Sequence, residues 1–331
     1  MTEPTATVVI LTYNGEDYLR EILEAVEGQV FDGEFEVLVI DSGSTDATLS
    51  IVADFPHVRL HQIPNEDFGH GRTRNLAAQL ARGEFVVFLT HDATPASDRW
   101  LQRMIEPFRI APSVMAVLGN QIPRPHCPPI MKYEIQGVFG RYGQDFSIHL
   151  MHQGDYGDDE GAMAVMGFYS DVNSATRRDF LLNTIPYRDV RYAEDQLFGH
   201  ELIERGFRKA YAPLAAVIHS NDVTFAEYPR RIFDETVGLR EIGFDVPVYS
   251  KRWIVNRVAR SIVGDTLRIL RDSTQSMSWK LRWLFVNPAF HVAKWRAYDR
   301  ASRVPLSDRA AIAAESLEHH RKIPDSDAAA Q

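Results

Sequence analysis

The sequence predicts an α/β protein, with a mostly parallel sheet flanked by helices and a helical C-terminal region. Three observations lead to this class. Short apolar runs rich in β-branched residues alternate with helical spacings over residues 6–90. Polar clusters directly follow these runs, and in parallel sheets ligands bind beyond the carboxyl ends of the strands. From about residue 223 onward the spacing is helical, without further convincing strands.

The elements are expected in a regular order along the first half of the chain. Apolar runs predict strands over residues 6–13, 35–41, 58–64 and 83–90. Between them, the spacing and start signals predict helices over residues 15–29, 44–55 and 71–81. Residues 122–130 are proline-rich and predict a loop. A helix is expected over residues 195–205, followed by a stop at Gly206 and by strand segments that end at His219.

Composition is that of an ordinary globular enzyme. The chain has 331 residues, 45% of them hydrophobic and 24% charged, enough for one large core or two modest ones. Cys127 is the one cysteine, so an intrachain disulfide is excluded. The first residues lack the basic and apolar regions of a signal peptide, and no apolar run approaches membrane-spanning length. We therefore expect a cytoplasmic protein.

Charge is distributed unevenly along the chain. Residues 251–300 contain eleven Lys or Arg against three Asp, a net charge of +8, whereas the whole chain carries −9 and the remainder therefore −17. Tryptophans lie among these cations at Trp253, Trp279, Trp283 and Trp295. This pattern fits helices lying on an anionic membrane surface. It also fits amphipathic helices packed on the rest of the chain with their arginines outward. Nucleic-acid binding is not expected, because most of the chain is acidic and carries no recognition motif.

The order of motifs resembles the inverting family 2 glycosyltransferases of GT-A fold. The matching segments cover about the first two thirds of the chain, in the family's order: VVILTYNGEDYL (8–19), VLVIDSGSTDAT (37–48), GRTRNLAAQLARGEFVVFLTHDATP (71–95), DVNSATRRDF (171–180), YAEDQLF (192–198) and YAPLAAVIHS (211–220). The segment FGHGRTRN (68–75), followed by HDATP and QIPRP, is most similar to the bacterial rhamnosyltransferase branch.

This resemblance implies a Rossmann-like sheet and a division of labour along the chain. Residues 1–120 would form the half that binds the nucleotide sugar, and residues 121–222 the half that binds the acceptor. The helical region 223–331 would contact a membrane surface or a second copy in a homodimer. The resemblance also implies transfer of a sugar, rhamnose from dTDP-rhamnose, to a cell-surface or lipid-linked glycan, at the inner face of the cell membrane.

The resemblance assigns the nucleotide to the first strand ends. It implies contacts from Thr12, Tyr13, Asn14, Asp41, Arg74 and His91. A carboxylate at Asp41 can accept hydrogen bonds from a base or from ribose hydroxyls. The alternative is that Asp41 organises a turn or caps a helix. Arg74 has the alternative of an ordinary surface ion pair.

The family places an Asp-x-Asp triplet at the end of the fourth strand, where a divalent cation, Mn²⁺ or Mg²⁺, binds the diphosphate. Here the triplet reads Thr90-His91-Asp92, so the first carboxylate is absent. The resemblance implies that Asp92 and His219 ligate the metal, and imidazole suits Mn²⁺ better than Mg²⁺. The alternative for Asp92 is that it caps a helix. The alternative for His219 is that it is a buried histidine with internal partners.

The pair Glu194-Asp195 opens the helix expected at 195–205. The family gives proton abstraction from the acceptor to the Asp of this pair, hence Asp195, and one displacement with one base inverts the anomeric configuration. Glu194 would hold the donor sugar or the helix start. The alternative is an acidic first turn without a catalytic role. Asp171 and Asn173 are expected to contact donor sugar or acceptor, and residues 153–163 to form a lid or a plain surface loop.

Three rival functions are weighed against this one. A UDP- or GDP-sugar donor would keep the fold and change the substrate. A nucleotidyltransferase would need a glycine-rich, basic phosphate loop after the first strand, and TYNGEDYL offers one glycine and two acids. A non-catalytic nucleotide-sugar-binding protein is suggested by the missing carboxylate at Thr90.

Overall fold

The structure is a computed structural model that describes residues 4–143, 147–152, 154, 160–220 and 223–322. The chain forms two compact units, each with its own contacts. The first unit comprises residues 1–124 and 135–220, and the second comprises 125–134 and 221–331. The two expected halves, 1–120 and 121–222, thus contribute mainly to one unit.

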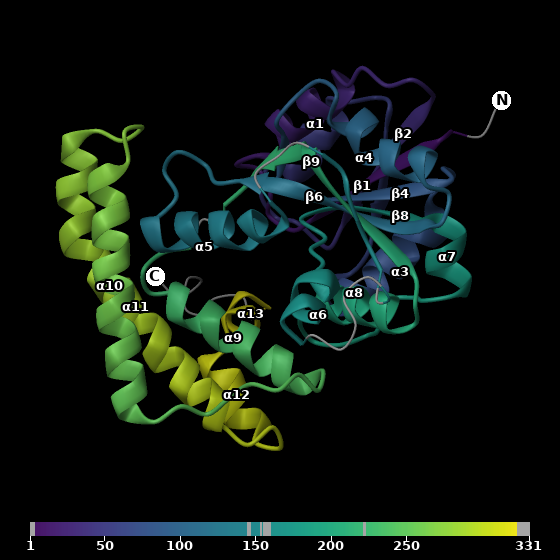
Figure 1. Ribbon diagram of the computed structural model, residues 1–331. Coiled ribbons are helices and arrows are strands. Elements are labelled where there is room, and N and C mark those ends of the chain that lie inside the picture. The colour runs from purple at the N-terminus through teal and green to yellow at the C-terminus, as the bar shows by residue number, and fades with distance from the viewer. Residues whose placement is uncertain (1–3, 144–146, 153, 155–159, 221–222, 323–331) are drawn as a thin grey trace, which may run out of the picture. The chain divides into compact units, whose positions relative to one another are not determined.

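The described residues of the first unit form one nine-stranded sheet (Figure 1). Its parallel part contains β1 (Ala6–Thr12), β2 (Phe35–Asp41), β3 (Val58–Gln62) and β4 (Phe85–Thr90) in the order β3-β2-β1-β4. Thr12 pairs with Asp41, and Leu11 pairs with Thr90. The polar groups that follow β1, β2 and β4 therefore lie at one edge of the sheet.

The remaining strands extend the sheet from β4. They are β8 (Asn173–Arg177), antiparallel to β4, then β6 (Val114–Ile122), β9 (Arg208–Ile218), β5 (Thr94–Pro95) and β7 (His149–Met151). Since β6 is antiparallel to β8 and parallel to β9, both β6 and β9 run in the direction of β4. Their carboxyl ends, and the residues before β8, consequently lie at the same edge as the end of β4.

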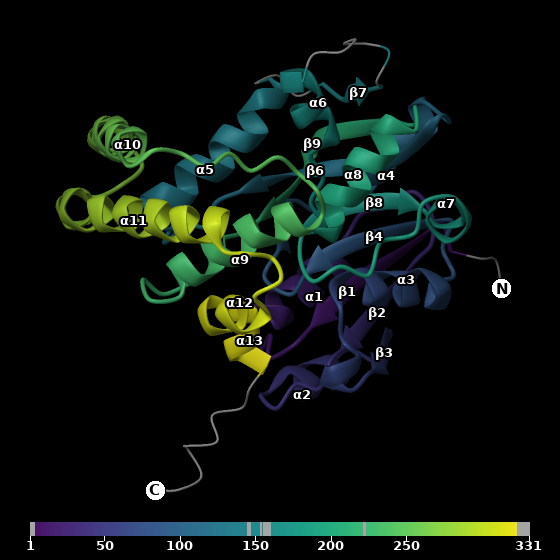
Figure 2. The ribbon, with the colours of Figure 1, turned by 90° about the horizontal axis from the view of Figure 1, so that it is seen from below.

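Helices cover both faces of this sheet (Figures 1 and 2). They are α1 (Leu19–Glu27), α2 (Thr48–Ala53), α3 (His70–Leu80), α4 (Trp100–Ile110), α6 (Glu160–Gly167), α7 (Arg178–Asn183) and α8 (Glu194–Glu204), with short 3₁₀ turns at Asn65–Asp67 and Gly140–Tyr142. Successive strand residues point to opposite faces. Thus Val8 and Val87 pack in the cluster that contains α1 and α4, whereas Val9 and Val86 pack with α3 and α8. Burial on both faces explains why β1 and β4 are continuous apolar runs.

The predicted fold class is confirmed, with differences at several elements. The four predicted strands and the helices at 71–81 and 195–205 lie within a few residues of their expected positions. The helix expected at 44–55 begins only at Thr48. The loop expected at 122–130 ends earlier, because α5 (Pro129–Phe139) starts with a proline, which the first turn of a helix tolerates. Of the stretch 153–163, residues 153 and 155–159 lie outside the described residues, and 160–163 begin α6.

The second unit is helical, as predicted. It contains the start of α5, and α9 (Tyr228–Glu241), α10 (Lys251–Arg271), α11 (Met277–Arg303), α12 (Arg309–Glu315) and α13 (Leu317–Lys322). Its core gathers aromatic side chains from these helices, among them Trp283 and Phe290 of α11 and Tyr228 of α9. Ser250 and Ser276 cap α10 and α11 by accepting hydrogen bonds from the backbone N–H groups of Trp253 and Trp279. Among the described helices, none is long and apolar enough to cross a membrane.

Asn173 connects four elements of the first unit. Its Nδ2 donates to the backbone oxygens of Asn120 on β6, at 2.9 Å, and of Ala215 on β9, at 2.7 Å. Its Oδ1 accepts the indole N–H of Trp100 on α4, at 2.9 Å. The residue is fully buried. Its amide is thus committed to the fold, and the expected contact with donor sugar or acceptor stays a prediction.

We predict that Asn173→Leu lowers the free energy of unfolding by about 3 kcal/mol, because three buried polar groups lose their partner. Urea unfolding of the purified variant measures this change. Asn183→Leu, at an exposed position on α7, is the matched control and should stay within about 0.5 kcal/mol of the wild type. A loss for Asn173→Leu no larger than that of the control would contradict this role.

Candidate active site

The first part of the site is the pair of loops that follow β1 and β2. Asp41 is fully buried at the end of β2. Its Oδ1 accepts hydrogen bonds from the backbone N–H groups of Gly43 and Ser44, both at 3.0 Å. Its Oδ2 accepts the hydroxyls of Thr12, at 3.0 Å, and Ser44, at 2.5 Å. The carboxylate therefore organises both loops, and a nucleotide contact from it would have to replace one of these bonds.

Asn14 holds the two loops together from the β1 side. It is exposed and has a φ of 48°, a left-handed conformation that Asn tolerates better than most residues. Its backbone N–H donates to Ser44 Oγ at 2.9 Å, and its Oδ1 accepts the N–H of Thr45 at 2.9 Å. Thr12 is buried, whereas Tyr13 is partly exposed. Of the four residues in these loops that were predicted to contact the nucleotide, Tyr13 and Asn14 are accessible to a ligand, whereas Thr12 and Asp41 are buried.

His91 and Asp92 follow β4 at the same edge of the sheet. A Cβ atom added to Gly15 would lie 3.1 Å from Cγ of His91, so glycine at this position permits the close approach of the β1 loop to the β4 loop. Arg124 steadies the other side, since its Nη2 donates to the backbone oxygen of Asp92 at 3.1 Å and to Thr94 Oγ1 at 3.0 Å. The backbone around Asp92 is thus fixed from two directions.

Asp92 and His219 lie next to each other, as predicted from their positions after strands that end at the same edge of the sheet. Asp92 Oδ2 lies 3.3 Å from His219 Nε2. The Asp92 side chain is 23% exposed and His219 is buried. Burial alone would raise the pKa of Asp92, but His219 and His91 hold it well below its usual range. The carboxylate is therefore ionised and reachable from solvent.

The other ring nitrogen of His219 indicates what this pair can hold. Nδ1 lies 3.2 Å from Gln121 Oε1, while Gln121 Nε2 donates to Ser170 Oγ at 3.2 Å. With its proton on Nδ1, a neutral imidazole presents a lone pair to the Asp92 carboxylate. Two facing acceptors require a positive charge, either a second ring proton or a bound cation. The oxygen and imidazole ligands fit a divalent metal on these grounds.

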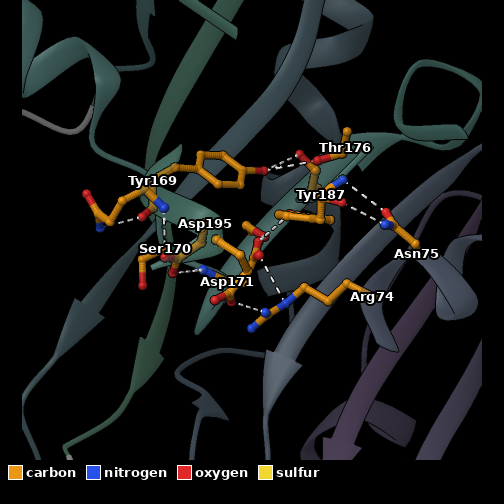
Figure 3. A network of polar contacts seen from close by, with 12 residues as sticks. Arg74, Asn75, Tyr169, Ser170, Asp171, Thr176, Tyr187 and Asp195 are labelled. Carbon is orange, nitrogen blue, oxygen red and sulfur yellow. Dashed lines mark hydrogen bonds and ion pairs between the residues drawn. The ribbon is translucent and has the colours of Figure 1, made fainter. Parts of the chain in front are cut away.

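The third part of the site is an acidic cluster around Arg74 (Figure 3). Arg74 is buried on α3, and its Nε lies 3.0 Å from Asp171 Oδ2. Its Nη1 forms a close ion pair with Glu194 Oε1. Asp171 Oδ1 also accepts hydrogen bonds from the hydroxyls of Ser174, at 2.5 Å, and Tyr187, at 2.8 Å. Arg74 is thus buried between two carboxylates, which differs from the alternative of a surface ion pair. Its expected contact with the nucleotide stays a prediction.

Asp195 differs from its neighbours in lacking a cationic partner in these contacts. Its Oδ2 accepts the backbone N–H of Asp171 at 3.3 Å, and its Oδ1 accepts that of Gln196 at 2.7 Å. Burial, together with the carboxylates of Glu194 and Asp171, raises the pKa of Asp195 to about 8. Burial would also raise the pKa of Glu194, but Arg74 and His70 hold it below its usual range. One basic carboxyl group therefore lies beside two carboxylates that share a guanidinium.

The backbone before α8 is what directs this carboxyl group into the cluster. Ala193 has a φ of 62°, and it and Asn14 are the two non-glycine residues with positive φ in the part of the chain that the structure describes. Such a conformation persists only where the surroundings impose it, and it is frequent at functional sites. Glu194 and Asp195 follow at once and form the first turn of α8.

Asp171, Glu194 and Asp195 can also be considered as metal ligands. Each offers one oxygen, and the three oxygens lie within 4.8 Å of one another. Arg74 already supplies a positive charge to two of them. A cation in the cluster would compete with this guanidinium, whereas one between Asp92 and His219 would not.

The acidic cluster and the Asp92–His219 pair are connected by hydrogen bonds. From His219 the path runs through Gln121 to Ser170, and the next residue, Asp171, donates its N–H to Asp195. Sequence reasoning did not assign Gln121, Ser170 or Tyr187. Gln121 could have been found, because it lies next to the last residue of β6, close to the edge where Asp41 ends β2. The other two offer no signal, since their partners are close only in the folded chain.

Comparisons with known proteins identify the family of the chain. The sequence model of glycosyl transferase family 2 matches residues 7–181. The O-antigen chain rhamnosyltransferase RfbN of Salmonella typhimurium is 30% identical over 234 residues, which are 70% of this chain and 71% of RfbN. The O-antigen chain rhamnosyltransferase WbaN of Salmonella anatum is 30% identical over 238 residues, 71% of this chain and 72% of WbaN.

Solved structures show the same fold. The mannosyltransferase PcManGT from Pyrobaculum calidifontis, in complex with GDP-Man and Mn²⁺, superimposes with a TM-score of 0.52 at 20% identity, covering 97% of this chain and 79% of the other. TarS residues 1–349 of Staphylococcus aureus, in complex with UDP-GlcNAc, gives a TM-score of 0.52 at 20% identity, covering 97% and 82%. At this identity the likeness concerns the fold alone, and it confirms the predicted GT-A architecture.

Proposed function

The chain belongs to glycosyl transferase family 2, as its motifs predicted, and we propose that it transfers rhamnose from dTDP-rhamnose to a glycan acceptor with inversion at the anomeric carbon. The donor is supported by the similarity to RfbN and WbaN, both rhamnosyltransferases that act on O-antigen chains. The same similarity supports a cell-surface or lipid-linked glycan as the acceptor. A lipid-linked acceptor would be met at the cytoplasmic face of the cell membrane.

The single observation that carries the mechanism is the path from Asp92 and His219 to Asp195, made of hydrogen bonds through Gln121 to Ser170, the peptide link to Asp171 and the hydrogen bond from Asp171 to Asp195. A glycosyl transfer needs a cationic site for the leaving diphosphate and a base for the acceptor hydroxyl on the same side of the sheet. The path links the candidate cation site, Asp92 and His219, with the candidate base, Asp195, at one edge of the sheet. Asp195 is the base in this proposal. Its raised pKa gives the ionised carboxylate a high affinity for the hydroxyl proton, and this ionised form predominates only above about pH 8.

Arg74, Asp171 and Glu194 act as positioning residues for that base. Their ion pairs hold α8 against the start of β8, so that Asp195 keeps its place beside the site. Tyr13, Asn14 and His91 border the nucleotide in this proposal, with Thr12 and Asp41 shaping the loop beneath it. A one-step displacement uses one base and needs no carboxylate nucleophile.

A divalent cation, Mn²⁺ or Mg²⁺, would be held by Asp92 and His219. When bound, it would neutralise negative charge on the leaving diphosphate. The Gln121 side chain would orient the His219 ring, because its Oε1 accepts a hydrogen bond from the Nδ1–H group. Thr90, at the position of the absent carboxylate, adds no charge, so we expect the cation to bind weakly without donor.

Asp195→Asn should lower the rate of sugar transfer by about 10²–10⁴-fold, because an amide cannot take the acceptor proton. The rate is measured as release of nucleoside diphosphate from dTDP-rhamnose, UDP-GlcNAc or GDP-mannose, with a lipid-linked glycan as acceptor. Asp189→Asn is the matched control at an exposed position, 61% exposed, and should keep wild-type activity.

Two results would contradict parts of this proposal separately. Wild-type turnover by Asp195→Asn would remove the base assignment. Turnover of a UDP- or GDP-sugar alone would keep the enzyme class and remove rhamnose as the donor.

Asp92→Asn and His219→Gln should each weaken Mn²⁺ binding in the presence of dTDP by at least about tenfold. Electron paramagnetic resonance of free Mn²⁺ measures the binding. Asp98→Asn, exposed a few residues beyond the pair, is the control and should bind as the wild type does. If Asp195→Asn weakened binding and Asp92→Asn did not, the cation would belong to the acidic cluster instead.

A further inference from the structure

The second unit exposes apolar side chains along a helical hairpin, made of α10 and α11, which lie side by side (Figures 1 and 2). The exposed fractions are large for aliphatic and aromatic residues: Val255 67%, Val263 61%, Leu267 46%, Leu270 50%, Met277 66%, Leu281 54% and Phe285 83%. We call these seven residues the outer face. Single exposed apolar residues are normal, but a gathering of this kind marks an interaction surface.

Six of these seven residues form one stripe on each helix, and Val255 lies apart near the start of α10. On α11, Met277, Leu281 and Phe285 follow at intervals of four residues. On α10, Val263, Leu267 and Leu270 follow at intervals of four and three. Residues three or four apart are neighbours on a helix surface, so each set forms a continuous line.

Both stripes point away from the core of the unit. On α10, Arg268 lies over the Tyr133 ring of α5, and Asp265 accepts a hydrogen bond from His291 of α11. On α11, Trp283 and Phe290 pack into the core. At 100° per residue, each stripe lies on the side of its helix opposite to these core contacts. Each helix of the hairpin therefore exposes one apolar line on the side turned away from its core contacts.

Exposed arginines lie beside the apolar stripes on both helices. They are Arg257, Arg260 and Arg271 on α10 and Arg282 and Arg296 on α11. Some charges of the hairpin are paired: Asp265 faces Arg268 and His291, Asp272 faces Lys132, and Asp299 faces Arg303, while Lys294 and Arg300 pair with Glu134 and Glu315. The five exposed arginines named above form no ion pair with another described residue, so their charge is available to an anionic partner.

We propose that the outer face binds an anionic lipid bilayer, with its apolar side chains at the level of the acyl chains and its arginines at the headgroup phosphates. Apolar exposure alone would equally suit a second copy of the chain. The positive charge favours the bilayer over a second copy. Two copies of this face would repel each other, whereas an anionic surface attracts the arginines of both helices. This inference depends on neither the transferred sugar nor Asp195.

The anchoring residues differ from those that the sequence pattern suggested. Trp283 is buried in the core. Trp253 stacks on Tyr249, with ring centroids 3.6 Å apart, and contacts Trp295 edge-on. These contacts hold the tryptophans within the helical unit, although Trp253 stays 39% exposed, and Val, Leu, Met and Phe side chains form the outer face.

Flotation of the full-length protein with vesicles tests the proposal. Vesicles of phosphatidylcholine mixed with phosphatidylglycerol should bind the protein, and vesicles of phosphatidylcholine alone should bind it at least about tenfold less. The double variant Leu281→Ser/Phe285→Ser should weaken binding by at least about tenfold through lost apolar burial. Arg257→Gln and Arg260→Gln should each weaken it roughly fivefold, and added salt should act in the same direction.

Controls keep the result interpretable. Val30→Ser and Ile110→Ser remove exposed apolar residues of the first unit, 54% and 61% exposed, and should bind as the wild type does. Circular dichroism verifies that every variant is folded. Equal binding to both vesicle types, no binding, or unchanged binding by Leu281→Ser/Phe285→Ser would overturn the proposal. If that variant instead turned a dimer into a monomer in sedimentation, the outer face would be a contact between copies.

Discussion

The buried guanidinium of Arg74 is the interaction on which the rest of the site depends. It joins Asp171, which precedes β8, to Glu194, which opens α8. Burying three charged groups costs desolvation free energy, and this cost is offset only when each group has a partner of opposite charge. Removal of such a partner from a buried pair typically costs about 3–5 kcal/mol. Asp195 has no ion pair with this guanidinium. Burial and the carboxylates of Glu194 and Asp171 therefore raise its pKa more than Arg74 lowers it.

Topology brings the two ends of the site together. The reversal of β8 between β4 and β6 places residues 170 and 171 at the edge where β4, β6 and β9 end. Gln121, at the end of β6, can therefore bond to both Ser170 and His219. A sheet with parallel strands alone would have carried these groups to opposite edges. The same edge receives Asp92, so a cationic site and a base can serve one reaction.

The strands, and the edge of the sheet where the site lies, could be predicted from the sequence because they depend on local patterns. The runs at 6–13, 35–41 and 83–90 marked strands, and the polar residues after them marked the edge where Asp92 and His219 meet. Contacts between side chains far apart in the sequence could not be predicted. Nothing local shows that Arg74 meets Glu194 across 120 residues, or that Asp41 is saturated by its own loop. The left-handed Ala193 is also invisible, since alanine has no preference for that conformation.

The ionisation of Asp195 tests the account most directly. Since burial and two carboxylates raise its pKa, the group should be protonated at neutral pH and should lose its proton only near pH 8. Carbon-13 NMR of protein labelled at the aspartate carboxyl carbons follows this titration, with the Asp195 signal identified by its loss in Asp195→Asn. The account predicts a midpoint of about 8 in the metal-free protein. A midpoint near the ordinary aspartate value of about 3.9 would contradict it.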